Sequence, residues 1–191
     1  DDWNGTPPFS DNHASAVVEG HPFDQINISD KIPVQIAEII KDLDALFVDL
    51  QGIGIRSQSY TVTLLHLLHA GGIAGTPIII LDRPNPLGGE MVSGNIPQES
   101  LEYPTSFIPI PYRHGMTIGE LARLLNTEND HGADLMIIPM DNWQGQSWSE
   151  IGLEWAPISP GIYTRDDLER FTITSILGTD RRYGSGPVRR L

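Results

Sequence analysis

Three short segments of the chain, residues 49–56, 82–86 and 113–115, combine charged or amide side chains with glycine or proline. Together they supply two carboxylates, three guanidinium groups, two side-chain amides and one imidazole. Carboxylates serve in acid-base catalysis or as nucleophiles, whereas arginine and backbone amides bind anions and hydroxyl groups. These residue types suit a polar or anionic ligand.

The first segment, Asp49-Leu50-Gln51-Gly52-Ile53-Gly54-Ile55-Arg56, follows an apolar run and precedes a run with helical spacing. A Gly-x-Gly sequence in that context is part of the dinucleotide-binding fingerprint, but Ser57 stands where the third glycine belongs. Asp49 and Gln51 also occupy the end that would approach a pyrophosphate. A nucleotide-binding Rossmann enzyme is therefore the less favoured alternative to a polar ligand site, or to a loop in which Asp49 only satisfies backbone amides.

The second segment, Leu81-Asp82-Arg83-Pro84-Asn85-Pro86, predicts a rigid polar loop. Its two prolines restrict the backbone on either side of Asn85, and Asp82 and Arg83 place opposite charges next to each other. Such a loop suits the recognition of a sugar. The alternative is that Asp82 and Arg83 pair only to lock the loop.

The third segment, Arg113-His114-Gly115, precedes Thr117-Ile118-Gly119-Glu120, which has the spacing of a capping box. A cation, a titratable imidazole and free amide donors before a helix favour an anionic or polyhydroxylated ligand. We assign Glu120 to the cap. His66 and His69 lack a third ligand, so we expect them to pack and expect no metal site.

The elements that position these segments alternate along the chain. Short apolar runs predict buried strands at residues 43–50, 76–82 and 134–140. Helical spacing, with Gly71-Gly72 as a stop for the second helix and a second capping box at residues 164–167, predicts helices at 33–41, 59–70, 117–125 and 164–176. The alternation predicts an α/β, Rossmann-like parallel sheet with helices on both faces and a ligand site at the carboxyl ends of its strands.

Composition sets the remaining limits. Residues 1–30 mix turn-forming residues without a period, which predicts an irregular arm or junction, and residues 31–191 form the expected Rossmann-like domain. The net charge of −13 disfavours nucleic acid, and the absence of cysteine excludes disulfides and thiolate ligands. No apolar run reaches the roughly 18 residues of a membrane span. The tryptophans after residue 140 suit a core or a stacking platform beside a sugar.

Taken in order, the Asp49-x-Gln51, Leu81-to-Pro86 and Arg113-His114-Gly115 motifs, followed by Gly132-Ala133-Asp134-Leu135, resemble one bacterial family. It is that of the exo-acting β-N-acetylmuramidases, glycoside hydrolase family 171. The resemblance spans about residues 39–180. It implies a Rossmann-like domain joined to a smaller carboxyl-terminal domain, with a cleft between them that releases N-acetylmuramic acid from the non-reducing ends of peptidoglycan glycans. It implies no cofactor, a peptidoglycan-derived sugar or muropeptide as ligand, and an extracytoplasmic location.

The resemblance also assigns residues to the cleft by position. We assign catalysis to Asp49, Asp82 and His114, and substrate binding to Gln51, Arg56, Tyr60, Arg83, Asn85 and Arg113. Asp49 and Asp82 end strands that are expected to be neighbours, about 5 Å apart, and glycoside hydrolysis ordinarily needs two carboxyl groups. Our hypothesis is that these two hold the sugar or its reacting centre, that Arg113 binds the lactyl carboxylate of muramic acid, and that His114 has a positioning role.

The chain departs from the family pattern at three places. The family's upstream Glu-His-Gly motif has no counterpart, because Glu19-Gly20-His21 has another order. Gly52 replaces an aspartate, and Ile176-Leu177-Gly178 stands where the family has Leu-Glu-Gly. We also expect the family's carboxyl-terminal domain to be absent from this chain. The alternative to an enzyme is therefore a non-catalytic domain or fragment that binds cell-wall sugar.

Overall fold

The computed structural model describes residues 13–18, 21–97, 108–158 and 162–178. Its centre is a parallel sheet of three strands in the order β3-β4-β5. The strands are β3 (Leu46–Val48), β4 (Ile78–Leu81) and β5 (Leu135–Ile138). The expected α/β, Rossmann-like class is confirmed, and all three predicted strands are present, each shorter than its apolar run.

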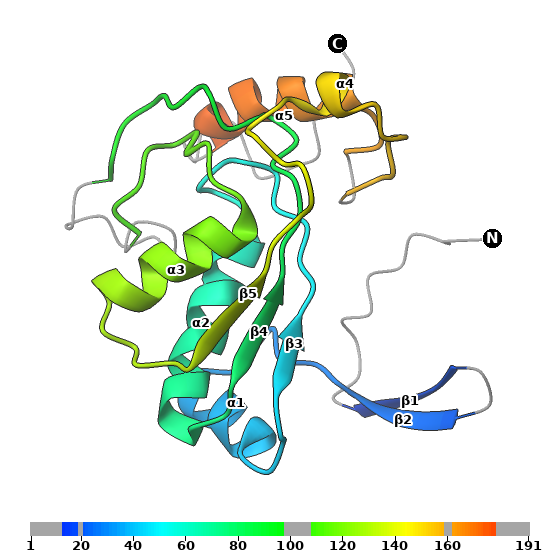
Figure 1. Ribbon diagram of the computed structural model, residues 1–191, viewed down its shortest axis with the longest axis vertical. Helices are drawn as coiled ribbons and strands as arrows, with labels where there is room; N and C mark the ends of the chain where they lie inside the picture. The colour runs from blue at the N-terminus through cyan, green and yellow to red at the C-terminus, as the bar shows by residue number, and fades with distance from the viewer. Residues whose placement is uncertain (1–12, 19–20, 98–107, 159–161, 179–191) are drawn as a thin grey trace.

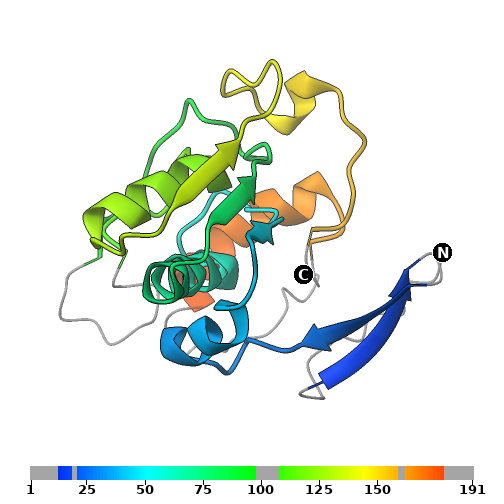
Figure 2. The same cartoon turned by 60° about the horizontal axis from the view of Figure 1, so that its bottom comes forward.

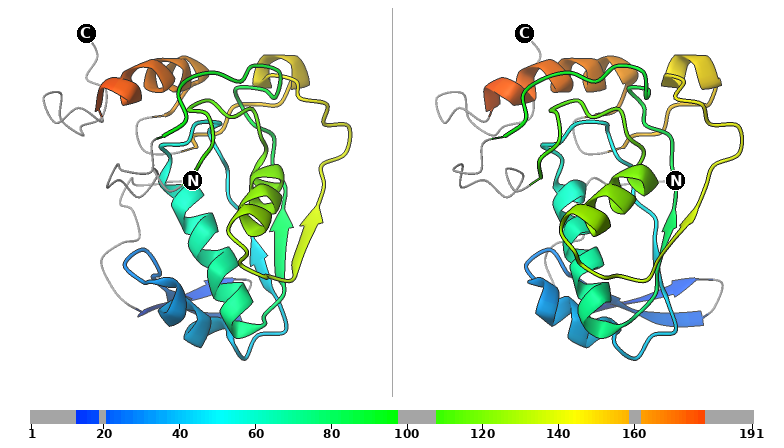
Figure 3. Two further views of the ribbon diagram at one scale, coloured as in Figure 1. Left: turned by 90° about the vertical axis from the view of Figure 1, so that its left-hand side faces the viewer. Right: turned by 60° about the vertical axis from the view of Figure 1, so that its left-hand side comes forward.

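Three helices cover one face of this sheet, and two more lie beyond the carboxyl ends of its strands. The first group is α1 (Pro33–Ile40), α2 (Ser59–Ala74) and α3 (Ile118–Glu128); the second is α4 (Trp148–Ile151) and α5 (Arg165–Gly178). Figure 1 shows α4 and α5 above the strand ends, and Figure 3 shows the first group together on one side of the strands. The loops after the strands therefore lie between the sheet and α5.

The expectation of helices on both faces is wrong for the described residues. The side chains of Val48, Ile78 and Ile80 face the helices and are at most 3% exposed. On the opposite face, Phe47 and Met136 are 63% and 58% exposed. The strands follow one another in a single direction across the sheet, so right-handed crossovers place α2 and α3 on the same face.

Helix α2 continues beyond its predicted end. Gly71 and Gly72 do not stop it; the helix ends at Gly75, which has a left-handed φ of 72°. Gly71 instead lets the helix approach β4 closely, because a Cβ atom there would lie 2.6 Å from Cγ1 of Ile78. At Gly72 a Cβ atom would lie 1.9 Å from the carbonyl oxygen of His131. Both glycines serve packing.

The prediction of an irregular arm for residues 1–30 requires a correction. Strands β1 (His13–Val18) and β2 (His21–Ile26) pair antiparallel, with Val18 opposite His21. Figure 2 shows this pair beside the main body. Its polar and proline-containing sequence hides the strand pattern, because one ladder of backbone hydrogen bonds needs no long apolar run. Residues 1–12 lie outside the described part of the chain.

Two apolar clusters stabilise the fold. The larger lies between the sheet and helices α1, α2 and α3 and includes Leu64, Leu68 and Leu121, each at most 1% exposed. The smaller lies at the carboxyl ends of the strands, where Ile53 and Ile55 pack against Leu168 of α5. Both predicted capping boxes, at Thr117 and Thr164, are confirmed. None of the described helices is long and apolar enough to cross a membrane.

The close approach of α2 to β4 yields a test. Gly71→Ala should lower the free energy of unfolding, because overpacking costs about 1 to 3 kcal/mol and exceeds the ~1 kcal/mol gain in helix propensity. In an Ile78→Ala background the added methyl group enters vacated space, so the same substitution should stabilise the chain. Urea unfolding of the four proteins measures this coupling. Equal effects of Gly71→Ala in both backgrounds would contradict the packing role.

Candidate functional site: a cleft at the carboxyl ends of the strands

A cleft of about 480 Å³ opens at the carboxyl ends of β3 and β4. One side comes from the first two sequence motifs, which contribute Gln51 and Arg83. The other side comes from the segment that starts with Trp148, the first residue of α4, and continues to Ile158 on the way to α5. The lining residues are Gln51, Arg83, Trp148, Leu153, Glu154, Ala156, Pro157 and Ile158. The edge of the sheet at which a ligand site was predicted therefore carries a cleft.

The cation in this cleft, Arg83, is held by Asp49. Two nitrogens of its guanidinium group, Nε and Nη2, donate hydrogen bonds to the Asp49 carboxylate, with an Nη2–Oδ2 distance of 2.7 Å. The hydrogen bond from Arg83 lowers the pKa of Asp49, and the same contact raises the pKa of Arg83. Both side chains remain about half exposed. The alternative in which Arg83 pairs with Asp82 is thus wrong; Arg83 links the first motif to the second.

Asp82 faces the start of α3. Its Oδ2 accepts a hydrogen bond from Thr117 Oγ1 at 2.9 Å, and its Oδ1 accepts one from the Gly119 amide at 2.8 Å. The Arg83 amide donates to Oδ1 at 3.0 Å. A carboxylate at this position satisfies free amides of the helix and interacts favourably with the helix dipole. Asp82 and Asp49 therefore have different partners, and Asp82 is not among the residues that line the cleft.

Gln51 joins the loops that follow β3 and β4. Its Nε2 donates to the carbonyl oxygens of Gly52 at 2.8 Å and Pro84 at 2.9 Å. Gln58, which lies outside the three sequence motifs, accepts a hydrogen bond from the Ile53 amide at 2.8 Å and donates one to the carbonyl oxygen of Gln51 at 3.2 Å. Gln51 thus lines the cleft while its amide group is oriented by its neighbours.

Asn85 is a buried residue that holds the loop after β4 in place. Its Nδ2 donates to the Met116 carbonyl at 3.1 Å, and its Oδ1 accepts from the Leu87 amide at 3.0 Å. Gly54 has a φ of 80°, and a Cβ atom there would lie 2.3 Å from Asn85 Oδ1. The glycine of the Gly-x-Gly sequence is therefore needed for packing against Asn85, which accounts for it without a phosphate.

Arg56 is buried and holds two loops together. Its Nη1 donates to the carbonyl oxygens of Asn95 at 2.7 Å and Ile110 at 2.6 Å, and its guanidinium carbon lies 6.0 Å from the ring centroid of Tyr112. Burial lowers the pKa of Arg56. Arg56 is not one of the cleft-lining residues, and neither is Tyr60, which lies partly buried in the first turn of α2.

Arg113 likewise points to its neighbouring loop. It donates to the Leu87 carbonyl through Nη2 and to Met91 Sδ through Nη1, the latter at 3.1 Å. Its Nε is buried and has no hydrogen-bond partner within the described part of the chain. Burial lowers the pKa of Arg113. Of the three arginines assigned to substrate binding, Arg83 lines the cleft, and Arg56 and Arg113 do not.

His114 is a buried neutral imidazole. Its Nδ1 accepts a hydrogen bond from the Met116 amide at 3.1 Å, which places the imidazole proton on Nε2. Burial, together with the nearby charge of Arg56, lowers the pKa of His114 to about 4. The side chain is 8% exposed and is not part of the cleft lining.

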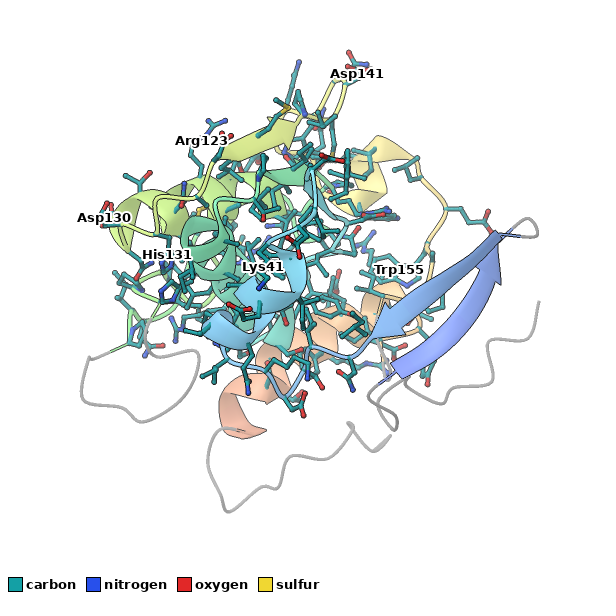
Figure 4. The ribbon with its side chains drawn as sticks, turned by 90° about the horizontal axis from the view of Figure 1, so that it is seen from below. Lys41, Arg123, Asp130, His131, Asp141 and Trp155 are labelled. Atoms are coloured by element: carbon teal, nitrogen blue, oxygen red, sulfur yellow. The ribbon has the colours of Figure 1, made fainter. Side chains whose placement is uncertain are left out.

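Trp148 and Glu154 are cleft residues that no sequence motif identified. Trp148 is one of the tryptophans for which a stacking role was considered, and its ring meets that of Trp155 edge to face with centroids 5.4 Å apart. Figure 4 labels Trp155 in the segment that connects α4 to α5. Glu154 has no motif around it. The spacing of the tryptophans was the available sequence signal, and it could not show which of them reaches the cleft.

The burial of His114 predicts a pH dependence of stability. The unfolded chain binds a proton at His114 near pH 6.5, whereas the folded chain keeps the residue neutral down to about pH 4. The free energy of unfolding should therefore be constant above pH 6.5 and fall by about 3 kcal/mol between pH 6.5 and pH 4, at 1.36 kcal/mol per pKa unit. Urea unfolding at a series of pH values measures this fall.

The matched variants for this measurement are His114→Asn and His131→Asn. Asparagine retains an acceptor near the position of Nδ1, so His114→Asn should fold and lose most of the dependence. His131, whose pKa is also lowered by burial, is only partly buried and should contribute a smaller part. An unchanged slope in His114→Asn would disprove the assignment.

Comparison with known proteins agrees with this architecture. Residues 20–166 match the family described as exo-β-N-acetylmuramidase NamZ, N-terminal. The chain is 34% identical over 154 residues to the peptidoglycan β-N-acetylmuramidase NamZ of Bacillus subtilis (strain 168), a match that covers 80% of this chain and 37% of that protein.

Two crystal structures of DUF1343 family proteins from Bacteroides fragilis NCTC 9343 are also similar. The first has a TM-score of 0.69 at 35% identity and covers 74% of this chain and 38% of its own. The second has a TM-score of 0.63 at 32% identity and covers 71% and 38%. The chain thus spans little more than a third of the length of these relatives. It belongs to the family of exo-β-N-acetylmuramidase NamZ amino-terminal domains.

Proposed function

We propose that the cleft binds N-acetylmuramic acid at the non-reducing end of peptidoglycan glycans, as part of an extracytoplasmic exo-β-N-acetylmuramidase. The observation that carries the proposal is that Gln51, Arg83 and Trp148 line one cleft. An oriented amide, a cation and an aromatic ring are the groups that recognise hydroxyls, a carboxylate and the apolar side of a sugar. Membership of the family and the activity named for the Bacillus subtilis relative support the same substrate class.

The charges around the cleft suggest a division of roles. The lactyl group gives N-acetylmuramic acid a carboxylate, and Arg83 is the cation in the lining. The sequence motifs favour Arg113 for this contact, but Arg83 is better placed for it because it lines the cleft. The pKa of Asp49 is lowered, so Asp49 is ionised at neutral pH and suits stabilisation of positive charge or nucleophilic attack, not proton donation. No cofactor is needed for this chemistry.

A complete hydrolase also needs a proton donor. Glu154 is a carboxyl side chain of the cleft lining, but it is exposed to solvent. Asp82 is engaged by the start of α3, and Asp49 is held by Arg83. We propose that, in proteins as long as the matched relatives, residues outside this segment supply the donor and complete the cleft. The same occupation of Asp49 and Asp82 favours the second candidate function, in which this chain binds cell-wall sugar without hydrolysing it.

Two measurements separate the candidates. A chromogenic β-glycoside of N-acetylmuramic acid reports hydrolysis, and an NMR titration with N-acetylmuramic acid reports binding. Turnover by the 191-residue chain would establish an enzyme, whereas binding without turnover would establish the sugar-binding function. Thermal stabilisation by NAD, with no response to either sugar, would instead indicate a nucleotide site.

The role of Arg83 gives a sharper prediction. Arg83→Gln should lower the affinity for N-acetylmuramic acid about tenfold or more, because a hydrogen bond to a charged group contributes about 1.5 to 3 kcal/mol. The same variant should change the affinity for N-acetylglucosamine much less, since that sugar has no lactyl carboxylate. NMR titrations with both sugars measure the difference.

Two other arginine variants serve as comparisons. Arg165→Gln removes a cation that pairs with Glu169 on α5, outside the cleft lining, and should leave both affinities unchanged. If Arg113→Lys discriminates between the two sugars and Arg83→Gln does not, the lactyl contact belongs to Arg113. Equal losses for both sugars in Arg83→Gln would show that Arg83 does not recognise the carboxylate.

A further inference from the structure

The wall of the cleft opposite Arg83 begins at α4, a short helix that is capped at both ends. Ser147 caps α4: its amide donates to Glu150 Oε2 at 2.7 Å, and its hydroxyl donates to the same oxygen at 2.6 Å. This contact lowers the pKa of Glu150. Gly152, with a φ of 70°, ends the helix and turns the chain back toward the cleft. Trp148, the first residue of α4, therefore starts from a defined backbone.

The indole of Trp148 is itself fixed from two sides. Its Nε1 donates to the carbonyl oxygen of Leu153 at 3.0 Å, so that two residues of the same cleft wall are joined by a hydrogen bond. Its ring also meets Trp155 edge to face at 5.4 Å. Trp155 packs against the smaller apolar cluster, which includes Ile53 from the loop after β3. The orientation of Trp148 is thus set before any ligand arrives, which lowers the entropy cost of binding.

The lining of the cleft is divided by polarity. Trp148 and Leu153, with the short segment from Ala156 to Ile158, make one wall largely apolar, and Glu154 is its charged residue. Gln51 and Arg83 lie on the strand-end side. A pyranose ring has the same division, because its C–H bonds gather on one face and its hydroxyls point outward. Aromatic rings carry negative charge density on their faces and attract such C–H groups.

We propose that Trp148 is a substrate-binding residue that stacks against the apolar face of the N-acetylhexosamine ring. The inference rests on the proposed function of the cleft and adds the residue that recognises the ring itself. Stacking contacts carbons that muramic acid and glucosamine share, so Trp148 contributes to the affinity for both sugars. Arg83, in contrast, contributes to the distinction between them.

The test is an NMR titration of the 191-residue chain with N-acetylmuramic acid and with N-acetylglucosamine, which follows the indole N–H resonances. Trp148→Ala should lower the affinity for both sugars by up to about tenfold, which is the upper range for an aromatic contact. Trp148→Phe keeps an aromatic face and should retain most of the affinity. Trp143→Ala, a change to a partly buried tryptophan outside the cleft lining, should leave both affinities as they are.

The outcomes distinguish this inference from the function on which it rests. The stacking role would be overturned if Trp148→Ala bound both sugars with unchanged affinity. If Arg83→Gln had at the same time a lower affinity for N-acetylmuramic acid, the proposed function would stand. Equal losses in Trp148→Phe and Trp148→Ala, with unchanged unfolding midpoints, would also overturn it. Binding of neither sugar by the unsubstituted chain would overturn both proposals.

Discussion

The contact between the Asp82 carboxylate and the start of α3 determines where the cleft can form. It joins the end of β4 to α3, the helix that connects β4 to β5, through Thr117 Oγ1 and the Gly119 amide. Gly119 permits the contact, because a Cβ atom there would lie 2.9 Å from Asp82 Cγ. Asp82 also accepts the amide of Arg83, so the residue that carries the cation leaves the sheet in a fixed direction. The ion pair with Asp49 then completes the anchoring of Arg83.

Most of the polar residues that the sequence singled out hold loops in place. Asn85, Arg56 and His114 are buried, and the donors and acceptors described for them satisfy backbone groups of adjoining segments. Irregular backbone at the end of a sheet has no ladder to bond to, so buried side chains must satisfy it. A motif dense in polar residues therefore marks a site partly because it builds the frame around the site. Only Gln51 and Arg83, of the residues proposed, also line the cleft.

The sequence predicted the elements well where a local pattern determines them. Apolar runs located β3, β4 and β5, and the capping boxes located the starts of α3 and α5. The errors arose where distant contacts decide. Gly71 suits α2 because Ile78 lies against it, and the described helices α2 and α3 share one face of the sheet because of the strand order. Trp148 and Glu154 reach the cleft through packing of their segment, for which the sequence has no periodic pattern.

The face of the sheet that no described helix covers affects how the isolated chain responds to temperature. Phe47, Met136 and Ile138 already contact water in the folded state, at 63%, 58% and 45% exposure. Unfolding therefore hydrates less new apolar surface than it does in a domain with both faces covered. Since apolar hydration dominates the heat capacity of unfolding, this increment should fall below the usual value of about 12 to 15 cal/mol/K per residue. A smaller heat capacity of unfolding gives a flatter curve of stability against temperature, so we expect a broad maximum for this chain.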